Sequence, residues 1–246
     1  MPPRGRLLVI DIGGTRVKCY CGEPRPIYFA SGRDMTPERM VRGVLEAAGR
    51  RRFAGVSIGY PGVVRDGRPA LEPVNLGRGW VDYDYAAALG APVRMLNDAA
   101  LQALGSYRAG TLLFLGLGTG LGTAAVASGA VLPLEFAHLP YKDGRSYEEW
   151  VGAAGLKRLG LREWRRCVVE IAGLLRRAFV ADDLALGGGN AARVIGKLPQ
   201  ARLVGEESAF HGGVRLWAPA PPAAAPHGSR APPGRPAPRA RRSRGE

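Results

Sequence analysis

The feature that most constrains the fold is a pattern that occurs twice: an apolar stretch, a glycine-rich turn, and a second stretch with the character of a strand. In the first copy, Leu7–Ile10 is followed by Gly13-Gly14 and then by residues 16–21, where polar and apolar side chains alternate. The second copy spans residues 112–127 and carries its glycines at 116–122. Each copy predicts a β-hairpin, because glycine breaks a strand and the flanking stretches have strand periodicity. The chain is therefore predicted to contain two related lobes.

Apolar periodicity predicts the remaining elements. Thr36 followed by Pro37 is typical of a helix start, and an apolar stripe at helical spacing follows at Met40, Val41, Val44, Leu45 and Ala48. Strands are predicted at 56–58, 93–96 and 184–186, and helices at 99–108, from Trp164 to Ala178, and from Asn190. This alternation of strands and helices predicts an α/β fold.

The chain is expected to divide into three parts. We place an N-terminal lobe at residues 1–98 and a C-terminal lobe at 99–217, with the last helix of the second expected to pack back on the first. Residues 218–246 are mostly Pro, Ala, Gly, Ser and Arg, so this tail is predicted to be disordered because it cannot bury enough apolar surface.

The chain has a formal net charge of +14. The tail carries six arginines and one glutamate, which gives +5 and leaves +9 for the rest. A basic protein attracts a nucleotide or polyphosphate as well as it attracts nucleic acid, and a merely solvated surface explains the charge equally well. Charge alone therefore does not choose a partner.

Location and redox state follow from simple counts. The longest aliphatic run near the start, Leu7–Ile10, is far too short to span a membrane, and no signal-peptide pattern follows it, so a cytoplasmic location without membrane contact is expected. Cys19, Cys21 and Cys167 are too few and wrongly spaced for a disulfide framework or a four-ligand zinc site, which favours reduced thiols.

The first chemical motif is Asp11-Ile12-Gly13-Gly14-Thr15, at the tip of the first predicted hairpin. Glycine allows backbone N–H groups to approach phosphate oxygens, the threonine hydroxyl adds a hydrogen bond, and the carboxylate is able to hold Mg²⁺ directly or through water. The turn therefore suits a polyphosphate. An ordinary Gly-Gly hairpin is the alternative.

The second motif is the loop 116–122, in which four glycines at alternate positions surround Thr119. A loop with so little side chain suggests close approach of the backbone to a ligand. Two such loops would clamp a phosphate chain from opposite sides of a cleft, which leaves the turn at Gly187–Gly189 for an adenosine group.

A polar pair, Asn97-Asp98, follows the apolar strand at 93–96. A carboxylate at this junction is suited to accept the proton of an attacking sugar hydroxyl. Helix capping is the alternative, because Asn and Asp are preferred at the N-cap. Further along, Glu135, His138 and Glu148 offer the acceptors and donors that bind sugar hydroxyls, although a lone histidine is more often structural.

Taken in order, six motifs resemble the ROK family of bacterial sugar kinases and repressors over about residues 7–217. They are Asp11-Ile-Gly-Gly-Thr, Tyr60-Pro-Gly, Asn97-Asp98-Ala, Gly118-Thr-Gly-Leu-Gly, Glu135-x-x-His138 and Gly187-Gly-Gly. Within that family, Pro61-Gly-Val-Val, Asn75 with Trp80, and Gly120-Leu-Gly-Thr-Ala look most like the polyphosphate glucokinase branch.

This resemblance implies the two-lobed actin-like ATPase fold, which is ribonuclease H-like, with a central cleft between the lobes. It implies Asp98 as the catalytic base, and it implies sugar contacts from Asn75, Asn97, Asp98, Glu135, His138 and Glu148. Phosphates and Mg²⁺ would be held by Asp11, Gly13, Gly14, Thr15, Lys18, Gly118, Thr119, Gly120 and Gly122. The base or ribose of a nucleotide would lie near Gly187, Gly188, Gly189 and Asn190. The implied reaction moves a phosphoryl group from ATP or polyphosphate to a hexose, with glucose as the best single substrate.

Three departures from the family pattern motivate an alternative. Ala137 stands where the family usually has glycine, the cysteines of a structural zinc site are absent after His138, and the stretch between Glu148 and the glycine triplet is short. No structural zinc is therefore expected, and the helical domain with its dimer surface is expected to be reduced. The alternative is an inactive sugar-binding or regulatory protein. DNA binding is not expected, because only six residues precede Leu7. The sugar, the donor and the oligomeric state stay open, with a homodimer as the candidate assembly.

Overall fold

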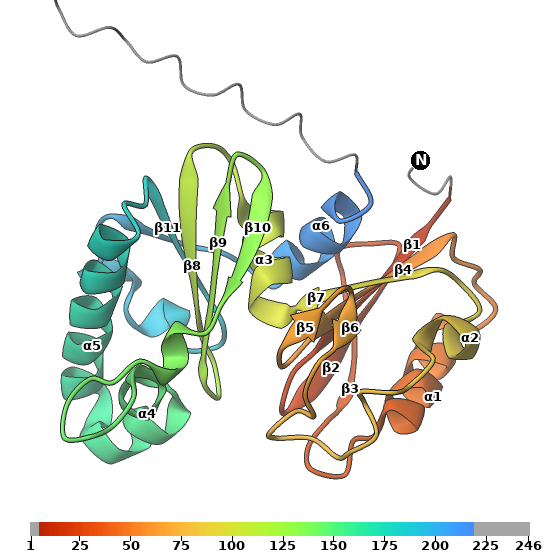
Figure 1. Cartoon of the computed structure of the whole chain (residues 1–246), viewed down its shortest axis with the longest axis horizontal. Helices are drawn as coiled ribbons and strands as arrows, with labels where there is room; N and C mark the ends of the chain where they lie inside the picture. The colour runs from red at the N-terminus through yellow and green to blue at the C-terminus, as the bar shows by residue number, and fades with distance from the viewer. Residues whose placement is uncertain (1–4, 219–246) are drawn as a thin grey trace, which may run out of the picture.

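The computed structural model describes residues 5–218 and has two lobes, each built on a five-stranded β-sheet (Figure 1). Both sheets have the same design: three antiparallel strands are followed by two strands that run parallel to the first. The N-terminal sheet has the order β3-β2-β1-β4-β7 and consists of β1 (Leu7–Ile12), β2 (Arg16–Cys21), β3 (Ile27–Ala30), β4 (Gly55–Tyr60) and β7 (Val93–Asn97). A separate ribbon of β5 (Val64–Arg65) and β6 (Arg68–Pro69) follows β4.

The C-terminal sheet repeats this order as β10-β9-β8-β11-β12. Its strands are β8 (Thr111–Leu117), β9 (Leu121–Ala127), β10 (Ala130–Leu134), β11 (Asp183–Gly187) and β12 (Ala201–Leu203). The pairs β1–β2 and β8–β9 are the two hairpins predicted from the sequence. The predicted α/β fold with two related lobes is therefore confirmed.

Helices lie outside both sheets and between them (Figure 1). The outer face of the N-terminal sheet is covered by α1 (Pro37–Ala48) and α2 (Tyr85–Leu89), and that of the C-terminal sheet by α5 (Ala153–Ala178), with α4 (Tyr147–Val151) before it. Between the sheets lie α3 (Asp98–Ser106) and α6 (Glu207–Arg215). Three short 3-10 helices complete the described residues: η1 (Phe136–His138), η2 (Ala191–Arg193) and η3 (Ile195–Lys197).

Helix α1 begins as the sequence predicts. The Thr36 side chain accepts a hydrogen bond from the Arg39 amide, and Pro37 occupies the first turn. Met40, Val41 and Val44 pack into the core of the N-terminal lobe. Leu45 belongs to the predicted stripe but is 48% exposed, so the prediction is wrong for this residue, which lies at the edge of the buried face.

Helices α3 and α6 approach each other very closely. A Cβ atom on Gly105 of α3 would collide with the backbone of Ser208, and one on Gly212 of α6 would collide with the carbonyl of Leu101. Helix α6 also packs on β1 and β4, while α3 contacts strands of both sheets. The predicted boundary at Asp98 therefore falls at the start of an element that both lobes share.

Helix α5 contains one break. Gly160 has φ 72°, so the helix is kinked there, and the segment after the kink buries Trp164, Val168, Ile171 and Leu175 as predicted. Among residues 5–218, no helix is long and apolar enough to cross a membrane. The predicted disordered tail lies outside the described residues except for Ala218.

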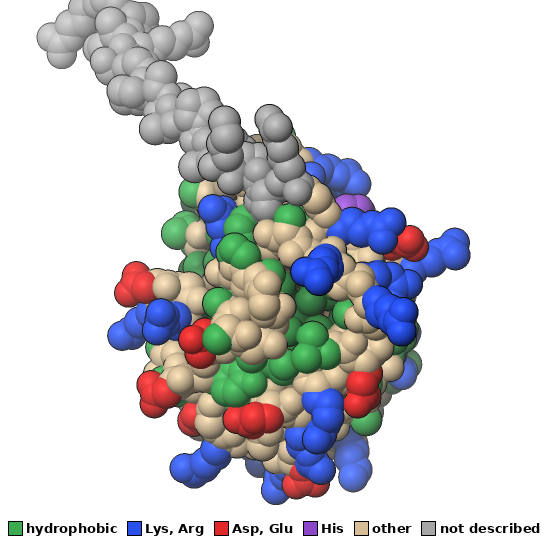
Figure 2. Space-filling view, turned by 90° about the vertical axis from the view of Figure 1, so that its right-hand side faces the viewer, with side chains coloured by type: hydrophobic (Ala, Val, Ile, Leu, Met, Phe, Trp, Pro, Cys, Tyr) green, Lys and Arg blue, Asp and Glu red, His purple; other side chains and the backbone are tan. Residues whose placement is uncertain are grey.

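Charged side chains are dispersed over the face of the N-terminal lobe. Figure 2 shows that face, on which Lys and Arg side chains alternate with Asp and Glu around an area of apolar side chains. On this side, the basic charge is therefore spread out and does not form one patch.

Candidate active site

The carboxyl ends of the parallel strands in both sheets open into one cavity of about 610 Å³ between the lobes. Strand β1 leads into Gly13 and Gly14, and β8 leads into Gly118 and Thr119, so both glycine loops line the cavity. Ligand sites in α/β sheets lie outside the carboxyl ends of the strands. The topology therefore creates a cleft with one glycine loop on each side.

The two loops approach each other across the cleft. A Cβ atom on Gly14 would lie 3.6 Å from the Cβ of Asn75 and 4.0 Å from the hydroxyl of Thr119. The first loop is closed by a hydrogen bond from the Gly13 amide to the Arg16 carbonyl, at 3.1 Å. Glycine at 14 thus leaves the space between the two lobes open.

The second loop is stabilised by hydrogen bonds within itself and from the turn at Gly188–Asn190. The Gly118 amide donates to the Gly120 carbonyl at 3.1 Å, and the Asn190 amide donates to the Leu117 carbonyl at 2.9 Å. Gly188 has φ +82°, and a Cβ atom there would lie 2.6 Å from the Leu117 carbonyl oxygen. This turn therefore requires glycine.

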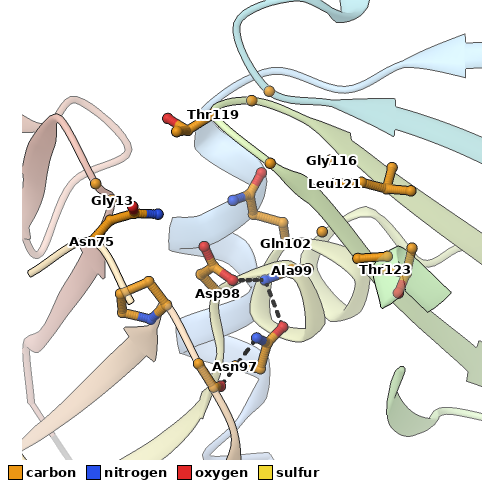
Figure 3. Close-up of a pocket in the computed structure, with 18 of the residues that line it drawn as sticks. Gly13, Asn75, Asn97, Asp98, Ala99, Gln102, Gly116, Thr119, Leu121 and Thr123 are labelled. Atoms are coloured by element: carbon orange, nitrogen blue, oxygen red, sulfur yellow. Dashed lines mark hydrogen bonds between the residues drawn. The ribbon is translucent and has the colours of Figure 1, made fainter. Parts of the chain in front are cut away.

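Asn97 and Asp98 lie where β7 passes into α3, and Asn97 is the N-cap. Its side-chain oxygen accepts from the amides of Ala99 and Ala100 at 3.0 and 3.2 Å, and its side-chain nitrogen donates to the Gly62 carbonyl. The capping alternative thus holds for Asn97. Asp98 accepts from the Ala99 amide at 2.7 Å and lines the cavity (Figure 3).

The surroundings of the Asp98 carboxyl group raise its pKa. Burial and then the negative charge of Asp11 raise its pKa to about 7, against the effects of the Ala99 amide and Lys18. A carboxyl with a pKa close to neutral is suited to exchange a proton with a substrate.

Asp11 lies behind the wall of the cavity and is 3% exposed. Lys18 donates to it at 2.8 Å and itself lines the cavity. Burial alone would lower the pKa of Lys18, but the ion pair with Asp11 outweighs this and the pKa is raised. Lys18 therefore remains a cation at neutral pH.

The residues present fit a magnesium ion that is bound mainly through its substrate. Asp11 and Asp98 bring two carboxylates close to a single ammonium group, which leaves an excess of negative charge. In the described part of the chain, no cluster of three or more acidic, His or Cys side chains is arranged to hold a metal. Mg²⁺ commonly takes one or two carboxylates and completes its shell with phosphate oxygens and water.

Four predicted sugar contacts also line the cavity: Asn75, Glu135, His138 and Glu148. Nε2 of His138 lies 3.6 Å from Oε2 of Glu135, and both side chains are at least half exposed. Burial and the charge of Glu148 raise the pKa of Glu135, although His138 acts against them. Glu148 accepts from the Leu121 amide at 3.0 Å and packs against Gly120, so it connects α4 to the second glycine loop.

Ala137, the departure from the family pattern, is compatible with its position. It is buried in η1, and it is not among the residues with positive φ. Its methyl group therefore imposes no backbone strain between Glu135 and His138.

Most of the predicted site residues line the one cavity, but three do not: Asp11, Gly187 and Asn190. Gly187 packs against the ring of Phe114, and Asn190 braces the second loop. Sequence reasoning missed several polar lining residues, namely Arg16, Glu72, Gln102 and Glu206. Only Arg16 adjoins a motif. Glu206 lies between β12 and α6, where the chain returns to the N-terminal lobe. There it accepts hydrogen bonds from Arg16 and Tyr28.

No family model matches the chain. A polyphosphate glucokinase of Mycobacterium leprae (strain TN) is 28% identical over 206 residues, which are 76% of this chain and 60% of that protein. The chain thus spans about 60% of the length of this curated relative.

Solved structures with the same fold cover nearly all of the described residues. The inorganic polyphosphate/ATP-glucomannokinase of Arthrobacter sp. strain KM has a TM-score of 0.73 and 25% identity, over 87% of this chain and 99% of its own. The ROK family glucokinase of Streptomyces griseus, solved with glucose and AMPPNP, has a TM-score of 0.71 and 19% identity, over 86% and 99%. The chain therefore has the actin-like ATPase fold of the ROK sugar kinases, and polyphosphate glucokinases are among its relatives in sequence.

Proposed function

We propose that this protein is a sugar kinase that transfers a phosphoryl group from ATP or inorganic polyphosphate to a hexose, with glucose 6-phosphate as the main product. One observation carries the proposal. Asp98, whose pKa is about 7, lines a cavity that has a glycine loop on each side. A base between two glycine loops suits phosphoryl transfer to a hydroxyl, because the loops would position the phosphates and the base would accept the proton.

In the proposed reaction, the hydroxyl oxygen of the sugar attacks the terminal phosphorus of the donor. A new oxygen–phosphorus bond forms, the bond to the bridging oxygen breaks, and the hydroxyl proton passes to Asp98. Asn97 supports this step because it caps α3 and fixes the backbone that carries Asp98. The protein contributes mainly position and charge, as expected for a loose transition state.

The phosphate end of the cleft is assigned to Gly13, Gly14, Thr15, Lys18 and the loop 118–122. The N–H groups of Gly13 and Gly118 are used within their loops, so those of Gly14 and Thr119 would approach the phosphate oxygens, and the Lys18 ammonium group would partly offset the phosphate charge. Asp11 would hold Mg²⁺ directly or through water, and this ion supplies charge neutralisation on the phosphates when bound. The turn at Gly187–Asn190 would lie beside a nucleotide base or ribose.

The sugar end is assigned to Asn75, Glu135, His138 and Glu148, together with Asn97 and Asp98. These side chains offer both donors and acceptors, as the hydroxyls of a hexose require. Glucose and mannose share most of these hydroxyls, so both belong in the substrate test. Ala137 has no backbone strain, so this departure from the family pattern gives no reason to expect an inactive protein.

The proposal also covers the phosphoryl donor, the cellular location and the oligomeric state. The relatives' names mention polyphosphate, and the Arthrobacter structure is named for both donors. Since ATP is made inside cells, we infer that the enzyme works in the cytoplasm. We keep a homodimer as the candidate assembly, to be checked by light scattering.

The test is a coupled assay for sugar phosphate, with glucose or mannose and with ATP or polyphosphate. We expect turnover with glucose, and Asp98→Asn should reduce kcat by about 10²- to 10⁴-fold while glucose binding stays. Asp82→Asn is the matched control, because Asp82 is exposed in the loop before α2. Glucose binding without any sugar phosphate, with all sugars and both donors, would contradict the proposal.

The same variant has a stability readout that shows whether it is folded. The pKa of Asp98 is raised from 3.8 to about 7, so the folded state favours the protonated form, and stability is lost as pH rises from about 4 to 7. Asp98→Asn removes this cost. We therefore expect its Tm to exceed that of the parent at pH 8, with a smaller difference at pH 5.

A further inference from the structure

Gln102 is a polar side chain in the cleft to which the proposed function gives no role. It lies four residues after Asp98 in α3, so the two side chains share one face of the helix. Both line the cavity, and Figure 3 shows the Gln102 amide pointing into it.

The Gln102 amide has no hydrogen-bond partner among the side chains and backbone groups of residues 5–218. The amide of Asn97, by contrast, accepts two hydrogen bonds and donates one within the protein, which leaves one N–H group for a ligand. A glutamine amide offers two N–H donors and an acceptor, and a partly buried polar group normally finds a partner. Gln102 therefore has donors available for a ligand.

Packing does not explain a glutamine at this position. The neighbouring residues of α3 that face the core are small or apolar: Ala99, Ala100, Leu101 and Ala103. The Gln102 side-chain oxygen lies beside the Gly187 turn, since a Cβ atom on Gly187 would be 3.3 Å from it. Around it, Gly116, Gly118, Gly122 and Gly188 also line the cavity and leave room there.

The distance between Asp98 and Gln102 along α3 indicates which part of the substrates Gln102 would contact. Four helical residues correspond to about 6 Å along the helix axis. A hydroxyl oxygen at Asp98 is about 3 to 3.5 Å from the phosphorus that it attacks. A side chain about 6 Å further on, toward the glycine loops, therefore lies beside the phosphates of the donor and away from the sugar.

We propose that Gln102 is a donor-binding residue, whose side-chain N–H group donates a hydrogen bond to a phosphate oxygen of the polyphosphate chain. This inference rests on the proposed function. A neutral donor suits the position, because a carboxylate there would repel both the phosphates and the ionised Asp98.

The test compares Gln102→Ala and the nearly isosteric Gln102→Glu with the parent enzyme. We expect kcat/KM for the donor to fall about 10- to 100-fold in Gln102→Ala, as for the loss of a hydrogen bond to a charged group, and further in Gln102→Glu. The KM for glucose should change less than twofold. The matched control is Gln200→Ala, which truncates an exposed glutamine outside the cavity.

Binding is measured separately with inorganic tripolyphosphate by calorimetry, in the presence of glucose. Gln102→Ala should weaken this binding and leave glucose affinity intact. Unchanged donor kinetics and tripolyphosphate affinity would overturn the inference, as would an equal loss for glucose and donor. If the parent enzyme phosphorylates no sugar, the proposed function fails, and tripolyphosphate binding alone then decides the role of Gln102.

Discussion

At the scale of single residues, the proton affinity of Asp98 is set by its surroundings and not by its residue type. Burial and Asp11 favour the protonated carboxyl group, while the Ala99 amide and Lys18 favour the carboxylate. These opposing effects hold the pKa at about 7, between that of an ordinary aspartate and that of a fully isolated buried one.

This pKa gives a direct expectation for the pH dependence of turnover. The base must be ionised to accept a proton, so kcat/KM for glucose should fall about tenfold for each pH unit below about 7. Steady-state rates from pH 5 to 9 would measure this, with the coupling enzymes in excess throughout. A flat profile down to pH 5 would contradict the assignment of Asp98 as the base.

Sequence reasoning found Asn97 and Asp98 because a polar pair interrupts an apolar strand at its end. It did not find Gln102 or Glu206, because each is a single polar residue with no motif around it. Their positions depend on the helix register of α3 and on where the chain crosses back to the first lobe. Such positions follow from tertiary packing and leave no local pattern.

At the scale of elements, the β-hairpins, α1, α3 and the second part of α5 were predicted from periodicity and from glycine and proline, whereas α2, α4 and the position of α6 were not. The strands predicted at 56–58, 93–96 and 184–186 lie within β4, β7 and β11. The crossing of α3 and α6 was not predicted in detail. Glycine within a helix usually weakens it, so Gly105 and Gly212 gave no positive signal for a close helix contact.

The close crossing of α3 and α6 predicts that a larger residue at Gly105 lowers the free energy of unfolding. Gly105→Ala would place a methyl group against the backbone of Ser208, and backbone is unable to move aside easily. We expect the free energy of unfolding in urea to fall by about 3 kcal/mol. Gly173→Ala in α5 is the control, because its Cβ would meet only the end of Arg177 at 3.4 Å.

In that control, alanine should stabilise the helix by about 0.5 to 1 kcal/mol through helix propensity. An equal effect of the two substitutions would show that the crossing tolerates a methyl group. The close packing of α3 against α6 would then not be a constraint on the fold.

At the scale of the whole molecule, the two-lobed arrangement follows from a repeated sheet design, and the cleft follows from where the strands end. Sequence alone gave the two hairpins, while the actin-like arrangement and its cleft came from the resemblance of six ordered motifs. Periodicity carries no information about how two lobes face each other. That arrangement depends on α3 and α6, which pack between the sheets.

The net charge of the chain gives an expectation about the donor. Residues 219–246 contain six arginines, so their removal lowers the attraction for a long polyanion. We expect this deletion to raise the KM for long-chain polyphosphate at low salt and to leave the KM for ATP unchanged. An unchanged KM for polyphosphate would exclude a role of these residues in recruiting the donor.

The packing of α6 and Trp217 on the N-terminal sheet has a consequence for folding during synthesis on the ribosome. Trp217 packs over Gly55 and donates to the hydroxyl of Ser57 at 2.8 Å, while α6 covers Val9 and Tyr20 of the first two strands. The earliest strands to emerge thus keep one face uncovered until translation has passed residue 217. During that interval α1 is able to cover only the outer face of the nascent N-terminal sheet, so the apolar face that includes Val9 and Tyr20 stays accessible to other chains.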